Sequence, residues 1–192
     1  MSLFFRRAPK DPEVRAIAAA RREAAFGYDG VGTTRERLAA APAGFELDQY
    51  GAGLGEGDEV WRRGRAALQR LRNYPPAFTR VVWETEREAH EGALFATVAS
   101  HFGFFSVHPC RVIFVVDEPN RFAVGFGTLP GHAELGEECF SLTRKDDGGV
   151  RYDVQAFSRP QGLARLGAPV ARGLQRRFQR ETILQMQAIA RG

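Results

Sequence analysis

The segment Gly127–Phe140 reads Gly-Thr-Leu-Pro-Gly-His-Ala-Glu-Leu-Gly-Glu-Glu-Cys-Phe. It lies between two strand-like runs and brings together three glycines, one proline, one histidine and three carboxylates. The pair Pro130-Gly131 is typical of a type II turn, because proline fixes φ at the second turn position and glycine accepts the positive φ of the third. The segment therefore predicts a β-hairpin.

The runs on either side of this hairpin extend it into an antiparallel meander. Their connections, such as Asp117-Glu118-Pro119-Asn120 and Asp146-Asp147-Gly148-Gly149, are short, whereas parallel strands need long crossovers. The predicted strands are Phe45–Gly53, Phe78–Glu86, Ala93–Ser106, Cys110–Asp117, Arg121–Leu129, Glu134–Arg144 and Val150–Ser158. Period-two alternation predicts one apolar wall and an opposite face: the wall is Phe114, Val116, Phe122, Val124 and Phe126, and the opposite face carries Ile113 and Val115.

Three helices are expected around this sheet. The first begins with Asp11 as N-cap and Pro12 as first helical residue and ends before Gly27. It is the predicted cover for the opposite face. The second follows Asp58, and the third, long one follows Pro160, with Pro169 near its start. The third carries an apolar stripe at multiples of four: Leu166, Val170, Leu174, Phe178 and Met186. Layer packing then predicts an α+β fold, a curved antiparallel sheet of about seven strands wrapped around a long C-terminal helix, with an additional N-terminal helix.

Four stretches resemble the DUF1990 family, a domain of unknown function: Tyr28-Asp29-x-Val31-Gly32-x-Thr34, Pro109-Cys110-Arg111, the Gly127–Phe140 segment and Phe157-Ser158-Arg159-Pro160. One departure is His108, where the resemblance implies asparagine before Pro-Cys-Arg. The order of elements is similar to the START-like, birch-pollen-allergen-like helix-grip superfamily. The resemblance implies a sheet gripping the last helix, with a cavity for a small molecule between them, and it gives no reaction. We expect one domain, with residues 1–44 as N-terminal helix and loops and residues 45–192 as the helix-grip core.

Composition restricts the setting and the partners. The 192 residues carry a net charge of +4, and 25 of the 27 basic residues are arginines. Because 23 acidic residues are interspersed, we expect a solvated surface rather than a specific nucleic-acid site, which would concentrate its charge. No apolar run approaches the ~20 residues of a membrane span, and no secretory core precedes Arg6 and Arg7. With two cysteines only, a reduced, cytoplasmic protein is expected.

His132, Glu134 and Glu138 are the candidates for acid–base or metal chemistry. In a regular strand positions 134 and 138 share a face, with His132 close at the turn, and such a set can hold a divalent cation or relay a proton. A bulge at Gly136 would turn Glu138 away. The favoured alternative is structural, with these side chains bonded to the turn and to arginines, because no second histidine has zinc-ligand spacing to His132. No metal or cofactor is expected. Cys110 is interpreted as a buried thiol rather than a nucleophile.

The leading functional hypothesis is a binding protein for an apolar or amphipathic small molecule in the cavity between sheet and C-terminal helix. Gly125 and Gly127 are expected to leave room in its wall. The candidate ligand-binding residues are Tyr28, Arg159, His132, Glu134, Glu138, Thr128 and Phe126. Two alternatives stay open: a cyclase- or hydrolase-like enzyme that uses His132 with Glu134 or Glu138, and an arginine-rich interaction module.

Overall fold

The computed structural model describes residues 3–85, 87–101, 103–161 and 168–192. Within them, eight strands form one antiparallel sheet with the order β2-β8-β7-β6-β5-β4-β3, and β1 pairs with β5 outside this path. The strands are β1 (Phe4–Phe5), β2 (Glu46–Glu56), β3 (Thr79–Trp83), β4 (Leu94–His101), β5 (Phe104–Glu118), β6 (Arg121–Thr128), β7 (Glu134–Arg144) and β8 (Gly149–Pro160). The first long strand, β2, therefore pairs with the last, β8, and the predicted meander is confirmed.

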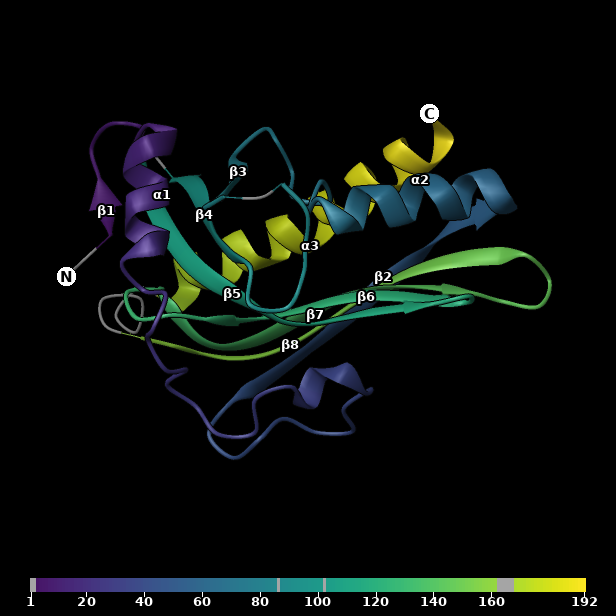
Figure 1. Cartoon of the computed structure of the whole chain (residues 1–192), viewed down its shortest axis with the longest axis horizontal. Helices are drawn as coiled ribbons and strands as arrows, with labels where there is room; N and C mark the ends of the chain where they lie inside the picture. Colours follow the sequence, from purple (N-terminus) through teal and green to yellow (C-terminus); the bar gives the residue numbers. More distant parts are fainter. Residues whose placement is uncertain (1–2, 86, 102, 162–167) are drawn as a thin grey trace.

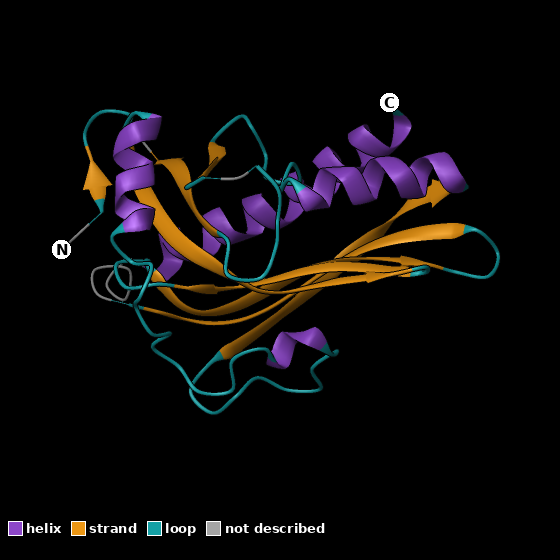
Figure 2. Cartoon of the chain, viewed as in Figure 1, coloured by secondary structure: helices purple, strands orange, loops and turns teal. Residues whose placement is uncertain are grey.

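The helices are α1 (Asp11–Ala19), α2 (Asp58–Gln69) and α3 (Ala168–Arg191), with a short 3-10 turn, η1 (Thr33–Arg35). Figures 1 and 2 show α2 and α3 side by side over the concave face of the sheet, with η1 and its flanking loop on the other side. The curved sheet around a long C-terminal helix is the predicted helix-grip arrangement. Of the predicted stripe, Leu166 and the side chain of Val170 lie outside the described part of the chain.

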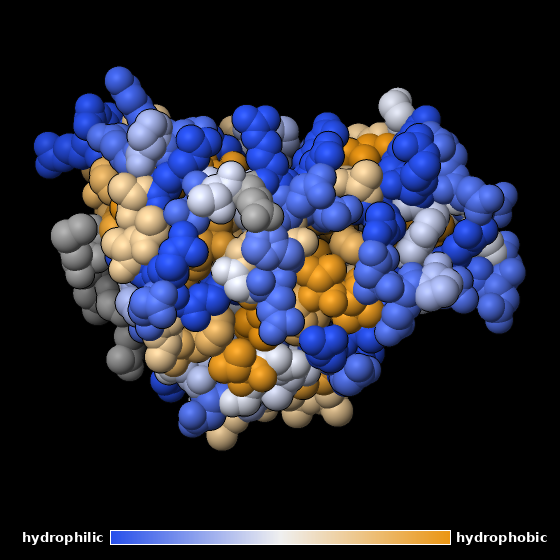
Figure 3. Space-filling view, viewed as in Figure 1, coloured by the Kyte–Doolittle hydropathy of each residue, from blue (hydrophilic) through white to orange (hydrophobic). Residues whose placement is uncertain are grey.

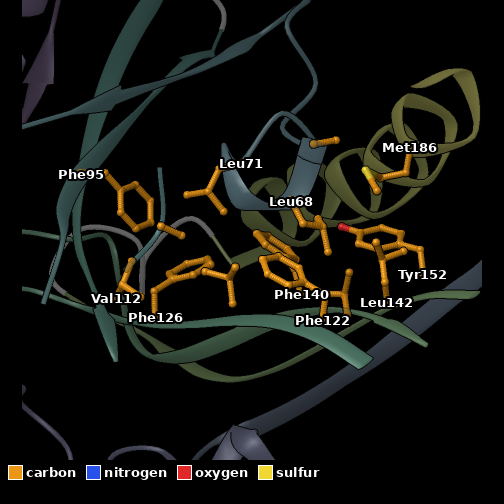
Figure 4. Packing of buried hydrophobic residues seen from close by; sticks show 14 of the residues in the cluster. Leu68, Leu71, Phe95, Val112, Phe122, Phe126, Phe140, Leu142, Tyr152 and Met186 are labelled. Carbon is orange, nitrogen blue, oxygen red and sulfur yellow. The ribbon is translucent and has the colours of Figure 1, made fainter. Parts of the chain in front are cut away.

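The core between the sheet and the two helices is apolar and closely packed. Figure 4 shows aromatic rings from neighbouring strands meeting Leu68 and Leu71 of the α2 region and Met186 of α3. A buried polar network fixes α3 at this end: the Tyr152 hydroxyl lies 3.1 Å from Asn73 Nδ2 and 3.0 Å from Thr182 Oγ1. Thr182 Oγ1 also donates to the Asn73 carbonyl, at 2.9 Å. This half of the interior is filled.

Two strand predictions are corrected. The run Ala93–Ser106 is not one strand, because the chain reverses between β4 and β5, where His101 pairs with Phe104 and Gly103 has a φ of 83°. The pairing of β5 with β6 also shifts register between Val112 and Phe114. This bulge moves the alternation by one residue, so Phe114 and Val116 pack on the outer face and Val115 packs toward the concave core.

The outer face has two covers instead of the single predicted one. Helix α1 packs with Val14 and Ala18 against β3, β4 and β5. The loop around η1 covers the centre of the sheet, where the Arg35 guanidinium lies 4.6 Å from the centre of the Phe114 ring. Helix α1 ends at Ala19, well before Gly27, which leaves the chain from Ala20 onward free to run across the sheet as this loop.

Candidate functional site

The Gly127–Phe140 segment forms the predicted hairpin between β6 and β7. The amide of His132 donates to the Leu129 carbonyl at 3.1 Å, and Gly131 has a φ of 96°, as a type II turn requires. Strand β7 then pairs with β6 and β8 in unbroken register. The possible bulge at Gly136 is therefore absent, and Glu134, Gly136 and Glu138 share the concave face.

Glu137 lies between these residues in sequence and on the opposite face in space. It is 2% exposed, and its carboxylate accepts hydrogen bonds from the Gly32 amide at 2.7 Å, the Thr34 amide at 2.8 Å and the Thr34 hydroxyl. The Tyr28 hydroxyl lies at 3.3 Å. These donors all belong to the loop before and through η1. Glu137 thus anchors this loop on the outer face, which is the kind of structural role that was expected of Glu134 and Glu138.

A cavity of about 430 Å³ lies on the concave face beside the packed core. Ala156 of β8 lies in its floor, between Asp48 of β2 and Glu138 of β7 in the sheet register. Neighbouring strands lie about 4.8 Å apart, so the short side chain leaves space above the sheet. Leu174 and Phe178 of α3 form the facing wall. Phe4 lines the cavity and is 51% exposed, which marks an opening to solvent.

Glu138 points into this cavity without a hydrogen-bond partner among the described residues. Burial, followed by the charges of Glu134 and Asp48, raises the pKa of its carboxyl from 4.5 to about 8. The hydroxyls of Tyr50 and Tyr74, which also line the cavity, likewise have no hydrogen bond within the described ranges. Burial raises the pKa of both phenols, and the charge of Glu138 contributes. Because these three groups line the cavity and form no hydrogen bond within the described ranges, they are available to a bound molecule.

The other two carboxylates of the cavity are bonded to α3. Gln175 Nε2 donates to Glu134 Oε1 at 2.6 Å, and Gln179 Nε2 donates to Asp48 Oδ1 at 3.3 Å. Burial raises the pKa of Glu134. These bonds fix α3 over the cavity and leave Glu138 as the unpaired acid.

Histidines form a chain along another wall. Ser106 Oγ lies 3.0 Å from His101 Nε2 and 2.7 Å from His108 Nε2, and the His108 and His132 rings are 4.8 Å apart. Burial lowers the pKa of all three, that of His132 to about 4. The Glu134 amide donates to His132 Nδ1 at 2.9 Å, so neutral His132 carries its proton on Nε2. Across the described ranges, no three His, Cys, Asp or Glu side chains are grouped to hold a metal ion.

The structure brings five of the predicted site residues together and separates two. His132, Glu134, Glu138, Thr128 and Phe126 all line the cavity. Tyr28 is instead buried under the outer loop, and Arg159 is exposed, 4.8 Å from the centre of the Phe45 ring. The prediction that Tyr28 and Arg159 line the cavity is therefore wrong.

The two glycines expected to enlarge the cavity also face away from it. A Cβ on Gly125 would overlap the Phe114 ring, and one on Gly127 would overlap Tyr28 and Phe26. These glycines admit aromatic rings on the outer face. Two residues without bulky side chains, Ala156 and Gly136, line the cavity instead. At Gly136 a Cβ would overlap the Phe157 carbonyl of the neighbouring strand.

No sequence pattern marks most of the remaining cavity residues. Tyr50 and Tyr74 lie far from the hairpin segment in the chain, and Ser106 sits inside the run that was expected to be one strand with β4. Period-two alternation along β2 could have placed Asp48 and Tyr50 on one face. The buried thiols of Cys110 and Cys139 are free, as expected, and burial raises the pKa of both, that of Cys139 to about 12.

Solved structures share the fold at low sequence identity. A protein of Thermus thermophilus, TTHA0849, has a TM-score of 0.55 at 14% identity, covering 75% of this chain and 96% of that one. The ginseng major latex-like protein 151 of Panax ginseng has a TM-score of 0.50 at 13% identity, covering 75% and 96%. These likenesses agree with the helix-grip fold. No helix in the described residues is long and apolar enough to cross a membrane.

Sequence comparison identifies the family. A UPF0548 protein of Deinococcus radiodurans is 32% identical over 185 residues, 91% of this chain and 92% of its own length. A UPF0548 protein of Arabidopsis thaliana is 30% identical over 146 residues, covering 72% and 70%. The profile of the family described as "Domain of unknown function (DUF1990)" matches residues 27–185. The match includes the outer loop, the hairpin segment and most of α3, and the chain therefore belongs to the DUF1990 family.

Proposed function

We propose that the protein binds an apolar or amphipathic small molecule in the cavity between the sheet and α3. The observation that carries this proposal is a cavity of about 430 Å³, into which Glu138, Tyr50 and Tyr74 point without hydrogen-bond partners from the described residues. Ligand sites are typically of this size, mostly apolar, with a few polar groups that fix orientation. The cavity has that composition, since aromatic and aliphatic walls surround a small number of polar groups.

The fold supports this proposal by dividing the concave face into two halves. At the α2 end, Phe140, Leu142 and Tyr152 fill the space under the helices. At the other end, the corresponding positions of β7 and β8 are Gly136 and Ala156, which cannot fill it.

The test is binding of a neutral lipophilic fluorophore, N-phenyl-1-naphthylamine, to the wild type and to two matched variants. Ala156→Leu fills the cavity floor, and Ala188→Leu makes the same change on an exposed position of α3. We expect Ala156→Leu to weaken binding at least about tenfold, since a leucine side chain occupies space that the probe needs, and Ala188→Leu to leave it unchanged. Equal binding by Ala156→Leu, or no saturable binding by the wild type, would refute the proposal.

A second candidate function is acid–base catalysis, because the pKa of Glu138 is about 8 and a general acid or base works best near the working pH. Neutral His132, with its proton on Nε2, lines the same cavity. The test is incubation of the protein with a metabolite extract, followed by mass spectrometry for compounds consumed. Turnover by the wild type that Glu138→Gln abolishes, while fluorophore binding persists, would favour the enzyme.

A further inference from the structure

The charge of the cavity indicates which kind of molecule it accepts. Asp48, Glu134 and Glu138 line it, and no arginine or lysine does among the residues that the structure describes. Both Asp48 and Glu134 contribute to the raised pKa of Glu138, so the three act on one another electrostatically. The protein has a net charge of +4, yet this part of its interior is acidic.

Only one of the three carboxylates is open to a ligand. The side-chain amides of Gln179 and Gln175 satisfy Asp48 and Glu134. Glu138 stands in the same row of the sheet as Asp48 and Phe126, with no such donor from α3 within the described ranges. A partner for Glu138 must therefore come from the contents of the cavity.

Aromatic rings surround this acid. Phe126 of β6 lies directly opposite Glu138 in the sheet register. Tyr74 and Phe178 also line the cavity, with their ring centres 5.3 Å apart. Tyr50 and Tyr74 are close enough for the charge of Glu138 to raise the pKa of each phenol. Aromatic faces attract cations, most strongly where water is excluded, and a carboxylate supplies the counter-charge.

We infer that the ligand is an amphipathic amine, whose cationic nitrogen pairs with Glu138 and whose apolar body lies against Phe126 and Phe178. This inference rests on the proposed function and narrows it to one ligand class. An anionic lipid would face three carboxylates, and a neutral ligand would bring no positive charge to pair with an ionised Glu138.

Proton release gives this ligand class a distinctive signature. The charges that act on Glu138 are those of Glu134 and Asp48. The charge of Glu138 acts in turn on five neighbouring groups, Tyr50, Tyr74, Cys110, Cys139 and Tyr152, and none of these seven groups is cationic. Without a ligand, the Glu138 carboxyl holds its proton at neutral pH because its pKa is about 8. A bound ammonium group favours the carboxylate, so binding must expel that proton, whereas a neutral ligand leaves it in place.

The experiment is isothermal titration calorimetry with three probes of one skeleton: phenylbutylamine, phenylbutanol and phenylbutyrate. Titrations at neutral pH in two buffers of different ionisation enthalpy measure the protons released. We expect the amine to bind about tenfold or more tighter than the alcohol, the butyrate to bind weakest, and the amine alone to release close to one proton.

Variants then locate the effect. Glu138→Gln should reduce the affinity for the amine to that for the alcohol, abolish proton release and leave the alcohol unchanged. Glu118→Gln, an exposed carboxylate at the end of β5, makes the same change of charge as a control and should change nothing. Binding of the alcohol as tight as that of the amine overturns the inference and leaves the proposed function standing. Failure of all three probes to bind overturns both.

Discussion

Replacing Glu137 by alanine tests whether Glu137, rather than the adjacent Glu138, stabilises the fold. Glu137 is 2% exposed and accepts hydrogen bonds from two backbone amides and one hydroxyl of the outer loop, with the Tyr28 hydroxyl at 3.3 Å. The variant leaves the Gly32 and Thr34 amides without their acceptor, and each unsatisfied buried donor costs about 1–3 kcal/mol. With the two hydroxyls, the expected loss is roughly 3–5 kcal/mol, in the range measured for breaking buried ionic contacts.

The assay is urea unfolding followed by the fluorescence of Trp61 and Trp83, with the melting temperature as a second measure. For a chain of this size, 1 kcal/mol shifts Tm by about 2–4 °C, so Glu137→Ala should melt roughly 6–20 °C below the wild type. Glu138→Ala is the matched control and should lose less than about 1 kcal/mol, because its carboxyl has no hydrogen bond to lose among the described residues. Equal stability losses for the two variants, or a loss below about 1 kcal/mol for Glu137→Ala, would refute the assignment of Glu137 as the anchor.

Four further outcomes are expected. Between pH 4.5 and 8 the folded chain holds a proton on Glu138 that the unfolded chain has released, so the contribution of Glu138 to stability falls as pH rises through this window. The pKa of His132 is lowered from 6.5 to about 4, so His132 has the opposite effect on stability, but only below pH 6.5. In a pH series of urea titrations, Glu138→Gln should therefore flatten the fall in stability between pH 6.5 and 8. Gly125→Ala should cost about 1–3 kcal/mol by overpacking against Phe114, whereas Gly53→Ala, where an added Cβ meets nothing within 4 Å, should be neutral in the same urea titration. Tyr152→Phe should cost about 1–3 kcal/mol by depriving Asn73 and Thr182 of a buried partner, and equal midpoints would contradict this. The face in Figure 3 carries hydrophilic residues around hydrophobic areas, and 23 acidic residues are interspersed with the arginines in the chain. Binding to DNA or RNA should therefore be weak and fade as salt rises; a sequence-specific complex that persists in a gel-shift assay at physiological salt would contradict this expectation.

Local signals in the sequence were enough for most of the elements, although they missed the reversal between β4 and β5. The Pro130-Gly131 turn, the short connections and the alternation of β7 depend on neighbouring residues alone, and β7 has the predicted bounds Glu134–Arg144. The antiparallel pairing of β5 to β8 followed because short connections permit only antiparallel neighbours, whereas the pairing of β2 with β8 joins strands about a hundred residues apart. The same alternation predicted that Glu134 and Glu138 share a face with His132 close by at the turn, and all three line the cavity.

Tertiary structure alone decided what each side of the sheet holds. The bulge between Val112 and Phe114 reverses the faces of β5, and no local pattern marks it. Whether a glycine makes room for a ligand or for a neighbouring ring depends on what packs against it, and Gly125 meets Phe114 across a strand pair. Glu137 and Glu138 are adjacent residues of the same type. Glu137 accepts hydrogen bonds from a loop that lies more than a hundred residues earlier in the chain, and Glu138 points into the cavity. Burial and partners are set by these distant contacts, and they decide which carboxylate stabilises the fold and which is available to a ligand.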